Sequence, residues 1–263
     1  MIGLFFGSTD FPKRILEKIK KRKIEYFIID LTNSRVFKKN QNSHYINIGK
    51  FGQILNLINQ KKCKKVLFAG KIDKPKISKM RLDFKGVYYI PRIIKAAKLG
   101  DAAILKELIK ILHENKIKVI KSNFFNPELT LSKGIYTTLK PNKSNLENIK
   151  IGINDLYKIN SHNHVQGLVV RNKKIIIRET EKGTQKMLQS VKYDKTQIGI
   201  LIKFPKKKQD KRADLPTIGL ETLKDCNKVG INGIVLKSNQ NIFLDKKKSI
   251  EYANKKKIFI KII

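Results

Sequence analysis

The feature that most constrains the fold is an alternation of short apolar runs with longer amphipathic segments over the first half of the chain. Short apolar runs predict buried strands, and apolar residues at three- and four-residue spacing predict helices. The strand-like runs are 2–6, 26–31, 65–68 and 116–120, and the helix-like segments are 13–22, 51–60, 87–98 and 101–115. Strands that alternate with helices predict a parallel, Rossmann-like sheet with crossover helices, so the fold class is α/β.

The alternation stops between residues 122 and 145, where prolines and a glycine mark a long connection. Such breaks are typical of domain boundaries. We therefore expect a Rossmann-like N-terminal domain over residues 1–135 and a second α/β domain over residues 136–263, which carries an acidic loop described below. In the second domain, helices are expected at 146–159, 182–190 and 220–228, and strands at 165–170, 174–178, 198–204, 233–236 and 242–244.

The charge is strongly basic: 58 Lys and Arg residues against 21 Asp and Glu give a formal net charge of +37. Such a balance usually favours nucleic acid. However, only eight of the 58 basic residues are arginine, the better bidentate partner of phosphate and guanine. We therefore expect no specific nucleic-acid partner, and a nonspecific preference for polyanions and anionic membrane surfaces.

Several features favour a cytoplasmic location. No apolar run reaches the length of a membrane span, and the N-terminus begins directly as a strand without a basic leader. Cys63 and Cys226 form no CxxC pair, which disfavours a disulfide scaffold or a zinc site. His162 and His164 would share one face of a strand, but no further ligands lie nearby in sequence, so surface histidines are favoured over a metal site.

Small residues follow several predicted strands of the N-terminal domain. Gly7 and Ser8 stand where nucleotide-binding folds place a phosphate loop, but GxGxxG and GK[ST] are absent. Two interpretations of Gly7 and Ser8 are therefore compatible with the sequence: a tight turn and a turn that binds an anion. The stretches 49–53 and 69–71 fall at strand ends on the same side of the predicted sheet. Each leaves room for a ligand and carries a lysine that could meet phosphate, although an ordinary loop is equally compatible.

The most chemically crowded segment is 209–219, Gln-Asp-Lys-Arg-Ala-Asp-Leu-Pro-Thr-Ile-Gly, between a strand-like run and a helix-like run. It places Asp210, Arg212 and Asp214 on one strand-to-helix loop, where α/β proteins locate their chemistry. Carboxylates beside cations suit a metal ion or a phosphate ester. An N-cap role for Asp214 or Thr217 in the following helix stays open as the alternative.

Together these motifs resemble the LpxI-type UDP-2,3-diacylglucosamine pyrophosphatases. The resemblance rests on Gln-Asp-x-Arg-x-Asp-x-Pro-Thr-Ile-Gly and on shorter motifs spread over nearly the whole chain. These are Gly49-x-Phe51-Gly52-Gln53, Ala69-Gly70-Lys71-Ile72-x-Lys74-Pro75, Gly100-Asp101, Pro127-Glu128-Leu129, Gln166 ahead of Val169-Val170, Glu179 and Gly183-Thr184.

The resemblance implies Mg2+-dependent hydrolysis of the pyrophosphate of UDP-2,3-diacylglucosamine, a glycolipid nucleotide. The products would be UMP and 2,3-diacylglucosamine 1-phosphate (lipid X), on the path to lipid A, with water directed to the phosphorus nearer the sugar. It implies catalytic roles for Asp214, Asp210 and Arg212, with Asp214 and Asp210 as metal ligands. It implies substrate binding by Gly7, Ser8, Gly52, Gln53, Gly70, Lys71, Gln166, Gly183 and Thr184.

The sequence also departs from the family pattern. Ala102, Lys182, Gln185 and Asn163 stand where acidic residues are expected. A catalytically impaired nucleotide-sugar-binding relative is therefore the alternative, and a basic nucleic-acid-binding protein is less favoured. Peripheral association with the inner face of the membrane and homo-oligomerisation both stay open.

Overall fold

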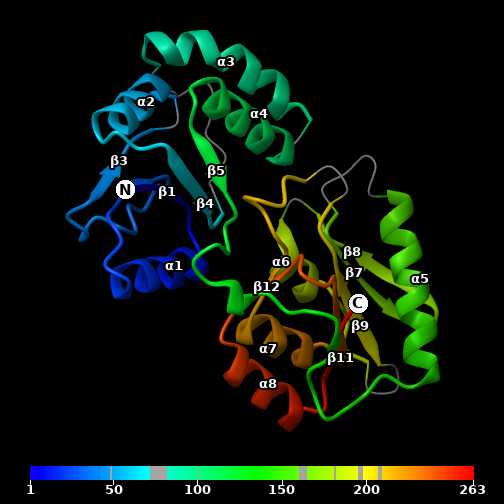
Figure 1. The fold of residues 1–263 in the computed structure, drawn as a ribbon. Helices are drawn as coiled ribbons and strands as arrows, with labels where there is room; N and C mark the ends of the chain where they lie inside the picture. Colours follow the sequence, from blue (N-terminus) through cyan, green and yellow to red (C-terminus); the bar gives the residue numbers. More distant parts are fainter. Residues whose placement is uncertain are drawn as a thin grey trace. The chain divides into compact units, whose positions relative to one another are not determined.

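The protein is described by a computed structural model that covers most of the chain and forms two compact units (Figure 1). The described residues are 1–47, 49–71, 82–99, 101–159, 165–180, 182–194, 198–206 and 209–263. Unit 1 is Met1–Pro127 with Gln209–Asp214, and unit 2 is Glu128–Lys208 with Leu215–Ile263. His162 and His164 lie outside the described residues.

Unit 1 contains a five-stranded, fully parallel sheet in the order β3-β2-β1-β4-β5. Its strands are β1 (Ile2–Phe6), β2 (Tyr26–Asp30), β3 (Ser43–Tyr45), β4 (Lys65–Ala69) and β5 (Lys118–Ile120). The central strand β1 is buried throughout, as a parallel strand covered on both faces should be. The predicted parallel, Rossmann-like sheet is confirmed.

Four helices accompany this sheet: α1 (Asp10–Lys21), α2 (Phe51–Gln60), α3 (Phe84–Ala97) and α4 (Asp101–Glu114). Ile15 and Ile19 of α1 are fully buried, in agreement with the apolar face expected from their spacing. The helix begins three residues earlier than the sequence indicates, because Pro12 fits in the first turn, where no N–H is needed.

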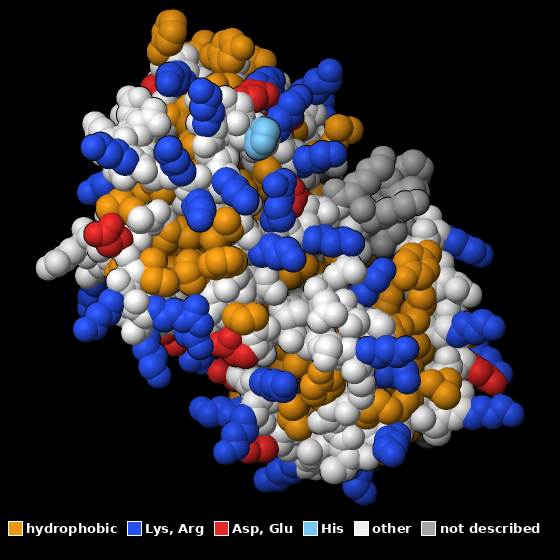
Figure 2. Space-filling view, in the orientation of Figure 1, with side chains coloured by type: hydrophobic (Ala, Val, Ile, Leu, Met, Phe, Trp, Pro, Cys, Tyr) orange, Lys and Arg blue, Asp and Glu red, His pale blue; other side chains and the backbone are white. Residues whose placement is uncertain are grey.

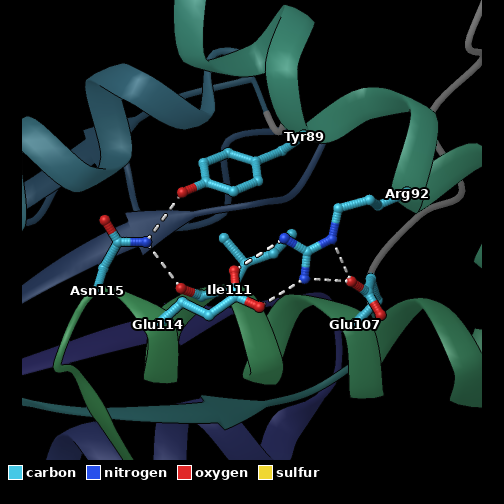
Figure 3. Close-up of polar contacts among 6 residues, drawn as sticks. All are labelled: Tyr89, Arg92, Glu107, Ile111, Glu114 and Asn115. Atoms are coloured by element: carbon cyan, nitrogen blue, oxygen red, sulfur yellow. Dashed lines mark hydrogen bonds and ion pairs between the residues drawn. The ribbon is translucent and has the colours of Figure 1, made fainter.

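Helices α3 and α4 form a pair joined by a polar clamp around Arg92 (Figure 3). Nε of Arg92 donates to Oε1 of Glu107 at 2.7 Å, and its two terminal nitrogens donate to the Glu114 carboxylate at 2.8 Å each. At the end of α4, Nδ2 of Asn115 donates to the Tyr89 hydroxyl at 3.2 Å. Hydrogen bonding by Arg92 lowers the pKa of Glu114. The clamp fixes α3 against its neighbour in one register.

Unit 2 contains a mixed six-stranded sheet in the order β6-β13-β11-β9-β7-β8 and a parallel two-stranded pair, β10-β12. The three central strands β13, β11 and β9 are parallel, and β7 is antiparallel to both of its neighbours. The strands are β6 (Gly134–Ile135), β7 (Gly167–Arg171), β8 (Lys174–Arg178), β9 (Gly199–Lys203), β10 (Thr217–Ile218), β11 (Ile231–Leu236), β12 (Ile242–Phe243) and β13 (Phe259–Ile262). The second α/β domain is thus present, with a mixed sheet.

Helices cover both faces of this sheet: α5 (Lys143–Ile159) lies on one face, and α6 (Gly183–Gln189), α7 (Leu220–Lys228) and α8 (Lys246–Lys255) contribute to the core of the other (Figure 1). Alternate residues of β7 divide between the two cores, with Leu168 and Val170 on the α5 side and Val169 opposite. Gly152 lets α5 approach closely, because a Cβ there would lie 2.4 Å from Cδ1 of Ile202. A short 3-10 turn, Pro127–Leu129, stands where unit 1 passes into unit 2.

Chain order and spatial packing differ for two segments. By chain order, residues 128–135 are expected in the first domain and residues 209–214 in the second. In the structure, residues 128–135 pack with unit 2 and residues 209–214 with unit 1. Among the described residues, every helix is too short or too polar to cross a bilayer.

Candidate active site

The acidic loop, Gln209–Asp214, is a compact turn built around Asp210. Nε and Nη2 of Arg212 donate to the two carboxylate oxygens of Asp210 at 3.0 and 2.7 Å, and the Arg212 amide adds a bond at 2.9 Å. These bonds from Arg212, the side-chain ones first, lower the pKa of Asp210, and the charge of Lys106 acts in the same direction. Asp210 is therefore held as a carboxylate with most of its acceptor capacity already used.

Backbone bonds fix the rest of the acidic loop. The amides of Ala213 and Asp214 both donate to the Asp210 carbonyl at 3.1 Å, and the Ser122 amide donates to the Arg212 carbonyl at 2.6 Å. Ala213 also packs against the apolar core of unit 1. These contacts explain why the loop belongs to unit 1, and they leave the Asp214 side chain half-buried at the end of the turn.

The helix-capping alternative for Asp214 and Thr217 is wrong. Helix α7 begins at Leu220, and its N-cap is Gly219, which has no side chain. Thr217 lies in β10, and its hydroxyl donates to the Leu215 carbonyl at 3.2 Å. Asp214 therefore stands five residues before the cap, and helix capping does not account for its carboxylate.

Gly7, Ser8, Gly70 and Lys71 come together where the loops after β1 and β4 meet. The amides of Ser8 and Lys71 each donate to the other residue's carbonyl at 2.8 Å, and Gly7 donates to the Ala69 carbonyl at 2.9 Å. A Cβ on Gly7 would lie only 2.1 Å from the Lys71 carbonyl oxygen, and Gly70 has a φ of 86°. The tight-turn alternative therefore applies to Gly7 and Ser8, because both amides are already used within the loop pair.

Gly52 and Gln53 lie at the N-terminus of α2. A helix N-terminus can bind an anion, and here a carboxylate of the protein itself, Asp83, takes that position. Their amides donate to the carboxylate of Asp83 at 3.0 and 2.8 Å, and the Gly86 amide donates to the same carboxylate at 2.7 Å. The Asp83 side chain thus caps the N-terminus of α3 and also accepts hydrogen bonds from the first amides of α2. Gly52 permits this approach, since a Cβ there would lie 2.8 Å from Oδ2 of Asp83. Sequence reasoning missed Asp83, although an Asp before a helix is a common capping signal.

Unit 2 holds a second polar group, the Glu179–Lys203 cluster, made of Glu179, Thr184 and Lys203. The Thr184 hydroxyl donates to Oε1 of Glu179 at 2.6 Å and accepts a short hydrogen bond from Nζ of Lys203. Nζ of Lys203 lies 3.8 Å from Oε1 of Glu179, and their side chains are only 9% and 7% exposed. Lys203 is a functional candidate that sequence reasoning missed, although it is the one cation in the apolar strand β9.

The Glu179–Lys203 cluster contains a buried acceptor without a partner. Oε2 of Glu179 has no hydrogen-bond donor among the described residues. Because a buried, unpaired carboxylate oxygen is costly, such an atom calls for an explanation, and a donor group of a bound ligand is one that fits. The start of β7 lies beside it: a Cβ on Gly167 would be 3.2 Å from this oxygen, and the backbone carbonyl of the preceding Gln166 accepts the Phe204 amide at 2.8 Å. Of the sequence-predicted residues, Thr184 therefore contacts Glu179 directly, and Gln166 is the chain neighbour of Gly167, which lies beside Glu179.

Gly183, the remaining predicted residue, begins α6 with a φ of 85°, a left-handed conformation that favours glycine. Its amide donates to the Thr180 carbonyl at 3.0 Å, which turns the chain so that Thr184 faces Glu179. Lys182 and Gln185, two of the positions that depart from the family pattern, are both exposed beside it.

The carboxylates of the acidic loop suit a Mg2+ ion that is bound partly by phosphate oxygens of the substrate. They suit a metal site made entirely of protein ligands less well. The described residues include no group of three or more His, Cys, Asp or Glu side chains placed to hold a metal. Mg2+ commonly binds through one or two carboxylates together with substrate phosphates and water. Asp210 and Asp214 are the carboxylates of the acidic loop, and Arg212 already bonds both oxygens of Asp210.

Comparison with known proteins decides the family. Residues 1–129 match the LpxI N-terminal domain and residues 132–261 match the LpxI C-terminal domain. The chain belongs to the LpxI family. It is also similar to the UDP-2,3-diacylglucosamine pyrophosphatase LpxI of Caulobacter vibrioides, with 27% identity over 223 residues that cover 82% of this chain and 80% of the relative. The resemblance inferred from sequence motifs is confirmed.

Proposed function

We propose that this LpxI family member hydrolyses the pyrophosphate of UDP-2,3-diacylglucosamine to UMP and 2,3-diacylglucosamine 1-phosphate, in lipid A biosynthesis. The observation that carries this proposal is the match of both LpxI domains, one after the other, over nearly the whole chain. The name of the Caulobacter relative supports the same substrate. The reaction would take place in the cytoplasm.

The acidic loop supplies the reacting groups in this proposal. A pyrophosphate diester repels nucleophiles, so its negative charge must be neutralised before water can attack. Arg212 bonds Asp210 through one edge of its guanidinium, and Nη1 on the other edge has no partner among the described residues. That edge would donate to a phosphate oxygen, while Asp214 orients the attacking water and accepts its proton.

Mg2+ is part of the proposal. It would be held by Asp214, with Asp210 as the second carboxylate, and would supply charge neutralisation at the pyrophosphate. Lys71 would add a cation to the same end of the substrate.

The Glu179–Lys203 cluster would bind a donor group of the substrate. Lys203 and Thr184 hold Oε1 of Glu179, and this fixes the direction of the unpartnered Oε2. A carboxylate oxygen fixed in this way accepts a hydroxyl or an N–H, groups that sugar and uracil both carry. Gln166, beside the cluster, adds an amide side chain with both donor and acceptor capacity.

An impaired relative that binds nucleotide sugars is the second candidate, favoured by Ala102, Lys182 and Gln185 in place of acids. The two candidates are separated by product analysis. Purified protein is incubated with UDP-2,3-diacylglucosamine in detergent micelles, with Mg2+, in 18O-labelled water. Hydrolysis yields UMP and 2,3-diacylglucosamine 1-phosphate, with the label in the sugar phosphate. Substrate binding without product formation would leave only the binding protein, and label in UMP would reject the proposed point of attack.

A further inference from the structure

Helix α3 presents an apolar face to solvent. Phe84, Val87 and Tyr88 are 93%, 61% and 70% exposed, and Leu82, just before the helix, is 40% exposed. In the space-filling view, hydrophobic side chains project at the edge of the molecule over α3 (Figure 2). A solvent-facing helix surface is normally polar, so an apolar one indicates a binding surface.

The opposite face of α3 is already used by the core. Gly86, Ile90, Ile93 and Ala96 are buried, and Ile90 and Ile93 belong to the apolar core of unit 1. The exposed aromatic residues are therefore not needed for packing within the unit. The Arg92 clamp to α4 holds α3 in place (Figure 3). Its outer face is therefore formed before any partner binds, and the entropy cost of ordering the chain on binding is small.

The charge of this surface is positive. Lys85, Lys95 and Lys98 are exposed on α3 or at its end, and the helix sequence itself contains no Asp or Glu. The adjacent Asp83 carboxylate is bound by three backbone amides, as described above. Arg92 is not counted, because two glutamates neutralise it. Exposed aromatic residues with flanking lysines are the pattern of a helix that lies in a membrane interface.

We propose that this α3 surface, Leu82, Phe84, Lys85, Val87, Tyr88, Lys95 and Lys98, docks the protein on an anionic phospholipid bilayer. The occupant follows from charge: a second copy of the chain would bring another +37 charges and be repelled, whereas an anionic bilayer is complementary. The inference rests on the proposed function in one respect, since a substrate with two acyl chains resides in a bilayer. Phe84 and Val87 enter the headgroup boundary, Tyr88 keeps its hydroxyl in the wet layer, and the lysines meet lipid phosphates.

Vesicle co-sedimentation of the whole chain tests whether the apolar side chains of the α3 surface contribute to membrane binding. Wild type binds vesicles that contain phosphatidylglycerol and binds pure phosphatidylcholine vesicles much less. Phe84→Ser/Tyr88→Ser lowers the partition coefficient by about tenfold or more, because two aromatic side chains no longer enter the interface. The matched control, Ile176→Ser/Tyr193→Ser, removes exposed apolar side chains of unit 2 and leaves binding unchanged. Failure of wild type to bind, or equal loss in both pairs, would overturn the proposal.

A charge pair tests the electrostatic part. Lys95→Gln/Lys98→Gln weakens binding to anionic vesicles about tenfold or more, given roughly a fivefold effect per lysine near the surface. Lys150→Gln/Lys158→Gln removes the same charge from exposed positions of α5 and has a much smaller effect. Equal effects would mean that diffuse charge alone binds the membrane. A dimer in solution that Phe84→Ser/Tyr88→Ser dissociates would assign the surface to a second copy instead.

The vesicles contain no substrate, so the result does not depend on turnover. Hydrolysis is measured separately in detergent micelles, where Phe84→Ser/Tyr88→Ser retains the wild-type rate. A wild type that binds vesicles but hydrolyses nothing would reject the proposed function and leave the docking surface in place. A wild type that hydrolyses the substrate but does not bind vesicles would reject the docking surface and leave the proposed function in place.

Discussion

Removing the buried cation Lys203 from unit 2 should destabilise the protein and reveal how tightly Glu179 is coupled to Lys203. In Lys203→Met, the Glu179 carboxylate loses the charge 3.8 Å away and stays buried, at 7% exposure. At an effective dielectric constant of about 20, the lost Coulomb interaction is about 4 kcal/mol. Breaking one side of a buried pair usually costs about 3–5 kcal/mol, so we expect about 3 kcal/mol after relaxation around Thr184.

Urea unfolding followed by far-UV circular dichroism measures this loss. The double variant Glu179→Gln/Lys203→Met should recover at least about half of it, because the uncompensated charge is gone. Lys150→Met, at an exposed position of α5, is the control and should change the free energy of unfolding by less than about 0.5 kcal/mol. If Lys203→Met unfolds like wild type, or if the two single losses simply add in the double variant, the coupling inferred from the structure is refuted.

Three further predictions follow from other contacts. Because Arg212 holds the pKa of Asp210 below its ordinary value, their pair stabilises the fold at neutral pH and is lost as pH falls through that lowered pKa. Arg212→Gln should therefore lower the urea midpoint at neutral pH, and its difference from wild type should shrink as pH falls toward about 3; identical urea midpoints of the two proteins over this range would contradict this. Arg92→Gln should lower the free energy of unfolding by about 1–2 kcal/mol, against less than about 0.5 for the exposed Arg14→Gln, as measured by urea unfolding. Gln185→Asp should lower the Mg2+ concentration needed for half-maximal UMP release, since hard cations prefer oxygen ligands, and superimposable titrations would place residue 185 outside the metal site.

Much of the fold follows from local pattern. The strand 2–6 and the helices 51–60 and 220–228 were predicted with the bounds that the structure has, because each is marked by a clear apolar run or helical spacing. Strand β3, Ser-His-Tyr, has no apolar run, and its position comes only from pairing with β2. The two-residue strand β10 is equally invisible, because pairing alone defines it.

The site was predicted less completely, for the same physical reason. The acidic loop stands out in sequence, yet its packing with unit 1 depends on contacts such as that between Ser122 and Arg212, which are distant along the chain. Lys203 is one lysine among many in the sequence, and only its burial beside Glu179 distinguishes it. Asp83 likewise acquires its second role because the fold brings α2 to it across thirty-one residues.

The most direct test of the central claim is UMP release by Asp214→Asn. Asp214 stands at the end of the acidic loop and does not cap α7, and the proposed reaction gives its carboxylate a direct part in the chemistry. With UDP-2,3-diacylglucosamine and Mg2+, we expect wild type to release UMP and Asp214→Asn to be slower by about 10²-fold or more, in protein that circular dichroism shows to be folded. The control Asp10→Asn, which alters an exposed pair with Lys13, should keep the wild-type rate. UMP release by Asp214→Asn at the wild-type rate would contradict the account.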